Sequence, residues 1–193
     1  LAIARQRYNP YGGAERFVEG ALSALAQSGS VEVTLLTRSW GESTGTAAGR
    51  RVEIVNPTYS RVPFGRVNRD RSFANAVGDI IRSDRFDLVQ AHERIPGCHI
   101  FRAGDGIHAA WLRHRQAGLS ALDSWWQRLD PYHAYTVDAE RAMFRHANLR
   151  AVICNSSMVA TEIRAEYDVA PENLRVVYNG VDLDLYSRES LLK

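Results

Sequence analysis

Short apolar runs alternate along the chain with segments in which apolar residues recur at helical spacing. The apolar runs predict strands over residues 1–4, 31–37, 51–55, 86–91, 98–103, 151–154 and 175–178. Helical spacing predicts helices over residues 17–25, 73–81 and 157–167, and over 108–146 with breaks at Gly118 and Pro131. This alternation is typical of a parallel sheet joined by crossover helices. We therefore expect an α/β fold, a Rossmann-like three-layer α/β/α domain with a mostly parallel sheet.

The composition narrows the class of protein. A chain of 193 residues with 45% hydrophobic residues can form one stable core without disulfides or metals. The formal net charge of +2 is too small to indicate a nucleic-acid partner, so none is expected. Cys98 and Cys154 have no partner at metal or redox spacing, which indicates reduced thiols in a cytoplasmic protein. No apolar run reaches the length of a membrane-spanning helix, and no set of histidines predicts a metal site.

Polar and glycine-rich segments follow several of the predicted strands, and in Rossmann-like domains ligands bind outside these carboxyl ends. Gly12 and Gly13 join the first strand to the first helix, where glycines let a ligand approach free backbone N–H groups. We expect an anion there, with an unliganded turn as the alternative. The segment matches neither the dinucleotide fingerprint nor the phosphate loop, which disfavours a nicotinamide dehydrogenase and a nucleoside triphosphatase.

Three motifs in order along the chain resemble the N-terminal half of the family 4 retaining glycosyltransferases of the GT-B fold. They are GGAER at residues 12–16, VICNSS at 152–157 and VVYNGVD at 176–182. The segment 104–106, with Asp105 at its centre, is most similar to the lipopolysaccharide-core glucosyltransferase branch. The resemblance implies two Rossmann-like domains that face each other across a cleft, the first for the acceptor and the second for the nucleotide sugar.

By this resemblance, residues 1–179 form the acceptor-side domain, one half of a GT-B fold, and residues 180–193 begin the interdomain linker. The donor domain, with its motif of two glutamates, is not found in this chain. Because the chain also starts at Leu1 instead of Met, we expect a piece of a longer protein that is inactive alone. Asn179 and Gly180 would form the hinge, with an ordinary turn as the alternative. Gly12 and Gly13 would contact the donor phosphate. The expected donor substrate is a nucleotide diphosphate sugar, UDP-linked, with no other cofactor and no metal.

Asp105 follows a predicted strand at the position where many family members have a histidine that contacts the transferred sugar. A carboxylate there could bind a sugar hydroxyl or stabilise positive charge that develops at the anomeric carbon, so Asp105 is the predicted catalytic residue. The alternative is that Asp105 caps the helix that begins near Ile107.

His92, Glu93 and Arg94 end another predicted strand and are predicted to bind acceptor hydroxyls or phosphates. The alternative is that His92 packs at the strand end while Glu93 pairs with Arg94. A hydrolase that uses Glu93 and Asp105 as paired carboxylates is a minor option, because the family transfers sugars without a second general acid.

Lys193 is the only lysine, so nearly all positive charge is guanidinium, which binds phosphate bidentately. One basic stretch, which includes Arg66, Arg69 and Arg71, is predicted as a loop before the helix at 73–81. The second stretch contains Trp111, Arg113, Arg115, Trp125 and Trp126. This combination of tryptophan and arginine is typical of a helix that lies in a membrane interface. Both stretches are predicted to dock an anionic membrane surface or a lipid-linked acceptor. Tryptophans packed on the sheet, with solvated arginines, are the alternative.

The resemblance and these residues together predict the acceptor-binding domain of a retaining glycosyltransferase. The whole enzyme would transfer a hexose to a saccharide or lipid-linked acceptor in lipopolysaccharide core biosynthesis, in the cytoplasm or peripherally on the inner face of the plasma membrane. The alternative is a non-catalytic carbohydrate- or phosphate-binding module that shares the fold.

Overall fold

A computed structural model describes residues 1–7, 27–39, 50–55 and 65–180, with five further positions between 18 and 25. The described positions from 18 to 28 are helical, which agrees with the helix predicted there. Gly12, Gly13 and the linker residues after Gly180 lie outside the described residues, so the predictions for them stay predictions.

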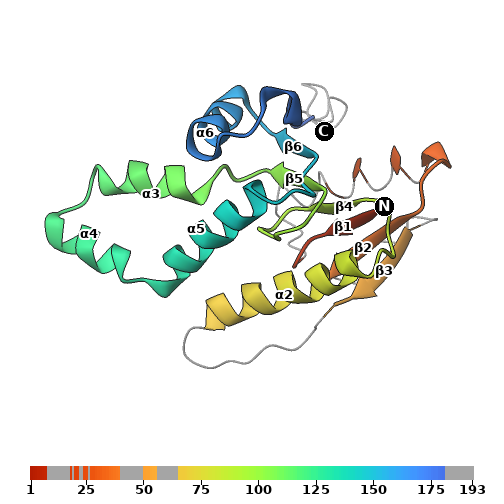
Figure 1. Cartoon of the computed structure of the whole chain (residues 1–193), viewed down its shortest axis with the longest axis horizontal. Coiled ribbons are helices and arrows are strands. Elements are labelled where there is room, and N and C mark those ends of the chain that lie inside the picture. Colours follow the sequence, from red (N-terminus) through yellow and green to blue (C-terminus); the bar gives the residue numbers. More distant parts are fainter. Residues whose placement is uncertain are drawn as a thin grey trace, which may run out of the picture.

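The described strands form one seven-stranded sheet in which every neighbouring pair is parallel. Its order is β3-β2-β1-β4-β5-β6-β7 (Figure 1). The strands are β1 (Ala2–Ala4), β2 (Val33–Thr37), β3 (Arg50–Ile54), β4 (Val89–Ala91), β5 (Ile100–Ala103), β6 (Ala151–Cys154) and β7 (Leu174–Val176). The α/β class and the parallel sheet predicted from the sequence are therefore confirmed.

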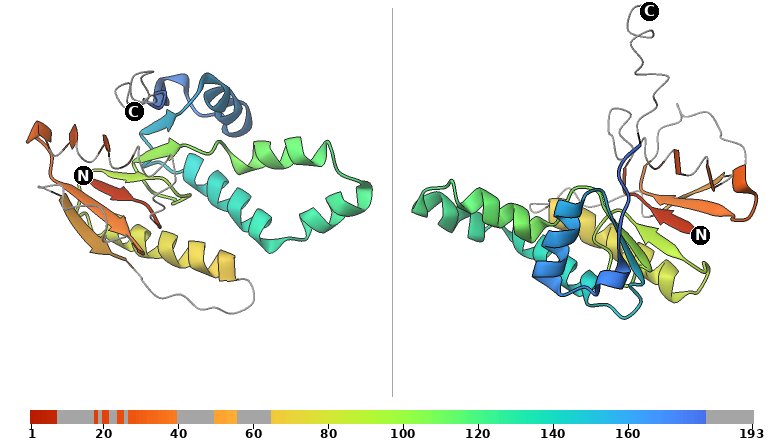
Figure 2. Two further views of the ribbon diagram at one scale, coloured as in Figure 1. Left: turned by 180° about the vertical axis from the view of Figure 1, so that it is seen from behind. Right: turned by 90° about the horizontal axis from the view of Figure 1, so that it is seen from above.

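The described helices are α2 (Gly65–Arg82), α3 (His108–Gln116), α4 (Ala121–Arg128), α5 (Pro131–Phe144) and α6 (Ser157–Tyr167), followed by the 3-10 turn η1 (Pro171–Asn173). The long helical pattern is divided close to the predicted breaks, because Gly118 follows α3 and Pro131 begins α5. Figures 1 and 2 show that α3 and α5 extend away from the sheet side by side and that α4 joins their far ends. We call α3, α4 and α5 the helical arm.

The helix α2 begins eight residues before its predicted apolar face, so Arg66, Arg69 and Arg71 lie on a helix and the predicted loop is wrong there. The first turns of α2 are rich in arginine and bury only Val67, which explains why the apolar pattern missed them. Arginine nevertheless has a high helix propensity, so this segment forms a helix without a continuous apolar face.

The core lies on both faces of the sheet, as the central strand β1 shows. Ala2 and Ala4 belong to the larger apolar cluster, whereas Ile3 between them belongs to a second cluster with Val18 and Leu35. Successive side chains of a strand point to opposite faces, so burial of all three residues requires a layer on each side. This explains why β1 is a continuous apolar run without alternation.

The strands β1 and β4 are neighbours at the centre of the sheet, and their connections leave in opposite directions. The chain continues from β1 to β2 on one side and from β4 to β5 on the other. A crevice opens at such a switch point, outside the carboxyl ends of the strands. The loops after β1 and β4 therefore border the ligand position that this topology provides.

Candidate functional site

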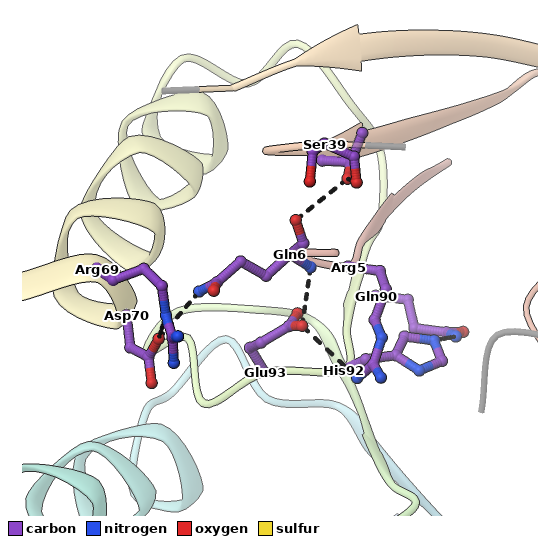
Figure 3. A network of polar contacts seen from close by, with 9 residues as sticks. Arg5, Gln6, Ser39, Arg69, Asp70, Gln90, His92 and Glu93 are labelled. Carbon is purple, nitrogen blue, oxygen red and sulfur yellow. Dashed lines mark hydrogen bonds and ion pairs between the residues drawn. The ribbon is translucent and has the colours of Figure 1, made fainter. Parts of the chain in front are cut away.

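The loops after β1 and β4 meet through Glu93. The backbone N–H of Gln6 donates a hydrogen bond of 2.8 Å to Glu93 Oε1, and Arg5 Nη1 lies 3.6 Å from the same oxygen (Figure 3). The side-chain amide of Gln6 donates a hydrogen bond of 3.2 Å from Nε2 to Asp70 Oδ1. The same oxygen accepts a hydrogen bond of 2.7 Å from Arg69 Nε. This network joins β1, β4 and α2 across the switch point.

A cavity of about 250 Å³ opens beside this network. It is lined by Arg5, Gln6, Arg7, Arg69, Asp70, His92, Glu93, Arg94, Asp105 and Tyr132. The structure thus brings the three predicted acceptor residues, His92, Glu93 and Arg94, to one cavity with Asp105. We call it the switch-point cavity.

Glu93 lies in surroundings that favour its neutral form. Burial raises the pKa of Glu93 to about 7, although the charge of Arg5 acts in the opposite direction. Its Oε2 atom is buried and has no hydrogen-bond partner among the described residues. Near neutral pH this carboxyl can therefore either accept or donate a hydrogen bond.

His92 is buried at the end of β4, and its Nε2 lies 3.0 Å from the Gln90 amide nitrogen. Burial lowers the pKa of His92 to about 3, and the charges of Arg102 and Arg5 act in the same direction. The imidazole is therefore neutral at physiological pH. His92 packs at the strand end, as the alternative interpretation of the sequence held.

The alternative interpretation, in which Glu93 pairs with Arg94, is wrong. Arg94 Nε instead donates at 2.8 Å to Glu140 Oε1, from the helical arm. Arg94 is close enough to Glu93 to act on its pKa, but its ion pair is with Glu140, which is only 1% exposed and therefore requires a cation.

Glu140 is a connecting residue that the sequence analysis missed. It accepts hydrogen bonds from His108 N at 2.6 Å, from Ala109 N at 3.2 Å and from the Tyr167 hydroxyl at 2.9 Å, in addition to the one from Arg94. The signal was present in the sequence, because Glu140 occupies the buried face of α5 with Thr136, Ala139, Met143 and Phe144. A charged residue on the buried face of a helix requires hydrogen-bond or ion-pair partners in the core.

Asp105 follows β5 and borders three hollows. The side chain is exposed, and the next residue, Gly106, has a φ of 72° that few other residues adopt. The alternative role of Asp105 as a helix cap is wrong, because the N-cap of α3 is Ile107 without a side-chain hydrogen bond. Glu140 binds the first N–H groups of α3 instead. Asp105 is thus available to the hollows around it.

The second hollow has a volume of about 500 Å³ and lies between α2, the loop after β4 and the helical arm. We call it the arginine–aromatic pocket. Its lining is Arg66, Arg94, Asp105, Ile107, His108, Trp111, Arg115, Asp130, Tyr132 and His133. Three residues predicted to dock a membrane or an acceptor, Arg66, Trp111 and Arg115, meet here.

Stacked rings and guanidinium groups build this pocket. The Arg66 guanidinium lies 3.8 Å from the Tyr132 ring centroid, and that of Arg115 lies 5.1 Å from the Trp111 centroid. His108 Nε2 lies 2.9 Å from His133 Nδ1, and the His108 ring stacks on Trp111. Burial lowers the pKa of His108 to about 4, and the charge of Arg94 acts in the same direction. His108 is therefore neutral at physiological pH.

The remaining predicted docking residues lie apart from this pocket. Arg69 borders the switch-point cavity, and Arg113 forms an ion pair with Glu166 of α6. Trp125 lies on α4 and is 53% exposed. The nearby Leu122 and Leu129 are exposed to a similar extent. The side chain of Trp126 is outside the described residues. For Trp111 and Trp125, packing on the sheet is excluded, because both lie exposed on the helical arm.

Asn155 and Asn179, from the other two motifs of the sequence, lie at the same edge of the sheet. Asn155 Nδ2 donates at 2.6 Å to the Gly104 carbonyl, beside Asp105. Asn179 Oδ1 accepts at 2.6 Å from Arg102 Nη2, beyond the end of β7. These contacts fix the turn before Asp105 and the segment that leads to Gly180.

Another hollow, of about 960 Å³, lies at the opposite edge, around the amino ends of β1 and β2. Its described lining includes none of the predicted site residues. Within the described part of the chain, no three His, Cys, Asp or Glu residues are grouped to hold a metal ion. In the same residues, no helix is long and apolar enough to cross a bilayer.

Comparisons with known proteins agree with this geometry. The sequence profile of Glycosyltransferase Family 4 matches residues 11–185, whereas no curated protein matches the chain. Among solved structures, WaaG, a glycosyltransferase involved in lipopolysaccharide biosynthesis, has a TM-score of 0.77 and 20% identity, over 95% of this chain and 46% of WaaG. Sucrose-phosphate synthase from Thermosynechococcus elongatus has a TM-score of 0.64 and 16% identity, over 95% of this chain and 49% of the synthase.

The chain spans about half the length of these two solved structures. Their likeness confirms the Rossmann-like fold as one half of a GT-B arrangement. Since the family profile covers nearly the whole chain and the fold agrees, the chain belongs to Glycosyltransferase Family 4.

Proposed function

We propose that the chain is the acceptor-side domain of a retaining glycosyltransferase. The whole protein transfers a hexose from a nucleotide diphosphate sugar, UDP-linked, to a saccharide or lipid-linked acceptor in lipopolysaccharide core biosynthesis. The observation that supports this most directly is the position of Asp105, where three hollows meet at the carboxyl edge of the sheet in a family 4 chain. The lipopolysaccharide assignment is supported by the similarity to WaaG.

Each part of the carboxyl edge has a role in this proposal. Asp105 stabilises the positive charge that develops at the anomeric carbon of the transferred sugar. His92, Glu93 and Arg94 bind the acceptor from the switch-point cavity, which all three line. Gly12 and Gly13 contact the donor phosphate. Residues 1–179 form this domain, and the segment from Gly180 onward leads to a donor domain that closes over the site and excludes water.

Donor binding and hydrolysis test the proposal. The whole protein that contains this chain should bind a nucleotide sugar and hydrolyse it slowly, and the chain alone should do neither. Failure of the whole protein to bind any nucleotide sugar would contradict the proposal. Binding of a saccharide without donor hydrolysis would assign the chain to a carbohydrate-binding module.

The role of Asp105 has its own test. Asp105→Ala in the whole protein should lower kcat about 100-fold, the effect of removing one group that stabilises charge in a transition state. Asp138→Ala is the matched control, because Asp138 is 73% exposed on the outer side of α5. An unchanged kcat in Asp105→Ala would show that Asp105 is not catalytic.

We also propose that the helical arm docks on an anionic membrane, which places the protein peripherally on the inner face of the plasma membrane. Trp111, Trp125, Leu122 and Leu129 expose apolar surface on this arm, beside Arg113 and Arg115. Rings at the level of the headgroups with cations nearby favour such a surface. Vesicles that contain phosphatidylglycerol should bind the protein at low salt, and Trp125→Ala should weaken that binding. Absence of binding at low salt would contradict the membrane role.

A further inference from the structure

We propose that the arginine–aromatic pocket binds a phosphoryl group on the acceptor saccharide. The inference rests on the proposed function, since it names the chemistry of the acceptor. Arginines from three separate elements reach this one hollow: Arg66 from the first turn of α2, Arg94 from the loop after β4 and Arg115 from the last turn of α3. Guanidinium groups bind phosphate oxygens through paired N–H donors, so their convergence indicates an anion.

The charge of the pocket is only partly balanced by the protein. Arg94 is neutralised by Glu140, which lies behind it in the core. Arg66 and Arg115 form no ion pair among the described residues, and each lies over an aromatic ring instead. A ring orients the guanidinium plane and leaves its N–H edges for a ligand. Two cations are therefore held in place with donors to spare.

Two carboxylates line the pocket, Asp105 and Asp130, and only Asp130 is engaged with other groups. Asp130 caps α5 by accepting from Tyr132 N at 2.8 Å, and it lies 3.7 Å from His133 Nε2. Asp105 lies close enough to Arg102 for its negative charge to raise the pKa of Arg102, although burial lowers that pKa by more. Asp105 therefore offsets part of the positive charge, and the three arginines of the lining outnumber its two carboxylates.

The size and position of the pocket favour a phosphorylated sugar over a free anion. A hollow of about 500 Å³ has the volume of a site for a small organic ligand and exceeds what one phosphate group needs. Asp105 lines this pocket and the switch-point cavity alike. A phosphoryl group held by the arginines would therefore leave the attached sugar beside Asp105 and Glu93.

Calorimetric binding without any nucleotide sugar tests this inference. The whole protein, with the chain alone in parallel, is titrated with glucose 6-phosphate, glucose and inorganic phosphate. Glucose 6-phosphate should bind at least about tenfold more tightly than glucose, because only the phosphoryl group engages the arginines. It should also bind more tightly than inorganic phosphate, because the sugar fills the remaining volume. Equal affinities for glucose and glucose 6-phosphate would overturn the inference.

Two variants locate the binding. Arg66→Gln and Arg115→Gln should each weaken glucose 6-phosphate binding about tenfold, the loss expected for a charge-assisted pair of hydrogen bonds. Both side chains are exposed, so the variants should fold, which circular dichroism would verify. The matched control is Arg82→Gln at the other end of α2, where Arg82 pairs with Asp79. Unchanged affinity in both pocket variants would overturn the inference.

The same phosphate chemistry occurs in lipid headgroups, and a vesicle experiment separates the two sources. If anionic vesicles bind through Arg66 and Arg115 while glucose 6-phosphate does not bind, the phosphoryl group belongs to lipid and the inference is wrong. Failure of the proposed function looks different. A protein that binds glucose 6-phosphate but transfers no sugar contradicts only the function, whereas transfer with equal KM for neutral and phosphorylated acceptors contradicts only the pocket assignment.

Discussion

Glu93 and Glu140 are two carboxylates close to Arg94, with opposite surroundings. Both oxygens of Glu140 are used, because Oε1 accepts from Arg94 and His108 N, and Oε2 from Ala109 N and Tyr167. Glu93 uses only Oε1, while its buried Oε2 has no hydrogen-bond partner among the described residues. Glu140 is therefore a structural residue that joins α3, α5, α6 and the loop after β4. Glu93 keeps hydrogen-bonding capacity for a ligand.

The comparison teaches how to separate structure from function in a buried acid. A carboxylate with all its acceptor positions filled by protein donors stabilises the fold and has nothing left for a substrate. A carboxylate with an unused oxygen at a cavity is held in a less favourable state, which a ligand or a proton can relieve. The three predictions that follow test this difference.

The largest effect is expected at Glu140. Glu140→Ala should lower the free energy of unfolding by about 3–5 kcal/mol, because it leaves Arg94 and three further donors without their acceptor. Asp138→Ala, on the same helix, removes an exposed pair with Arg141 and should cost about 0.5 kcal/mol or less. Urea unfolding measures both. Equal losses in the two variants would contradict the assigned role of Glu140.

A second prediction concerns the pH dependence of stability at Glu93. Its pKa is raised from 4.5 to about 7, so the folded protein binds the extra proton between these values. The contribution of Glu93 to the free energy of unfolding is complete below pH 4.5 and is lost as the pH rises to 7.

The contribution of His92 depends on pH in the opposite direction. Its pKa is lowered from 6.5 to about 3, so its contribution is complete above pH 6.5 and is lost as the pH falls to 3.

The two contributions oppose each other where their ranges overlap, between pH 4.5 and 6.5. Glu93→Gln should remove one of them, so that stability rises with pH across this range more steeply than in the unsubstituted protein. Relative to that protein, the variant should gain about 3 kcal/mol between pH 4.5 and 7, from 1.36 kcal/mol per pKa unit. Glu172→Gln at an exposed position is the control. Parallel pH profiles for Glu93→Gln and the unsubstituted protein would contradict the prediction.

The smallest effect is expected at Tyr167. Tyr167→Phe removes one of four hydrogen bonds to Glu140 and keeps the ring, which stacks on Phe144 at 4.6 Å between centroids. The free energy of unfolding should fall by about 1–2 kcal/mol, the contribution of one hydrogen bond to a charged group. Urea unfolding would measure it. A loss as large as that of Glu140→Ala would mean that the hydroxyl contributes more than one bond, and that Glu140 is less central than the contacts indicate.

Most of the sheet could be predicted because a strand buried on both faces is rich in apolar residues along its whole length, as β1 is. The position of Asp105 also followed, since residues after parallel strands gather at one edge. The start of α2 could not be predicted, because its arginine-rich first turns show no apolar period. The alternative that paired Arg94 with Glu93 was wrong, because the residue that Arg94 binds, Glu140, is 46 residues away in sequence and only tertiary packing brings the two together.

The sequence by itself determined the alternation of strands and helices, the family motifs and the set of chemical groups at the carboxyl edge. These depend on local periodicity and on residue type, which are readable in one dimension. Only the tertiary structure decided which charges pair, since burial and distance set that choice and both depend on packing. It assigned Arg94 to Glu140, left Glu93 with an unused oxygen, and brought Arg66 and Arg115 from separate helices to one pocket.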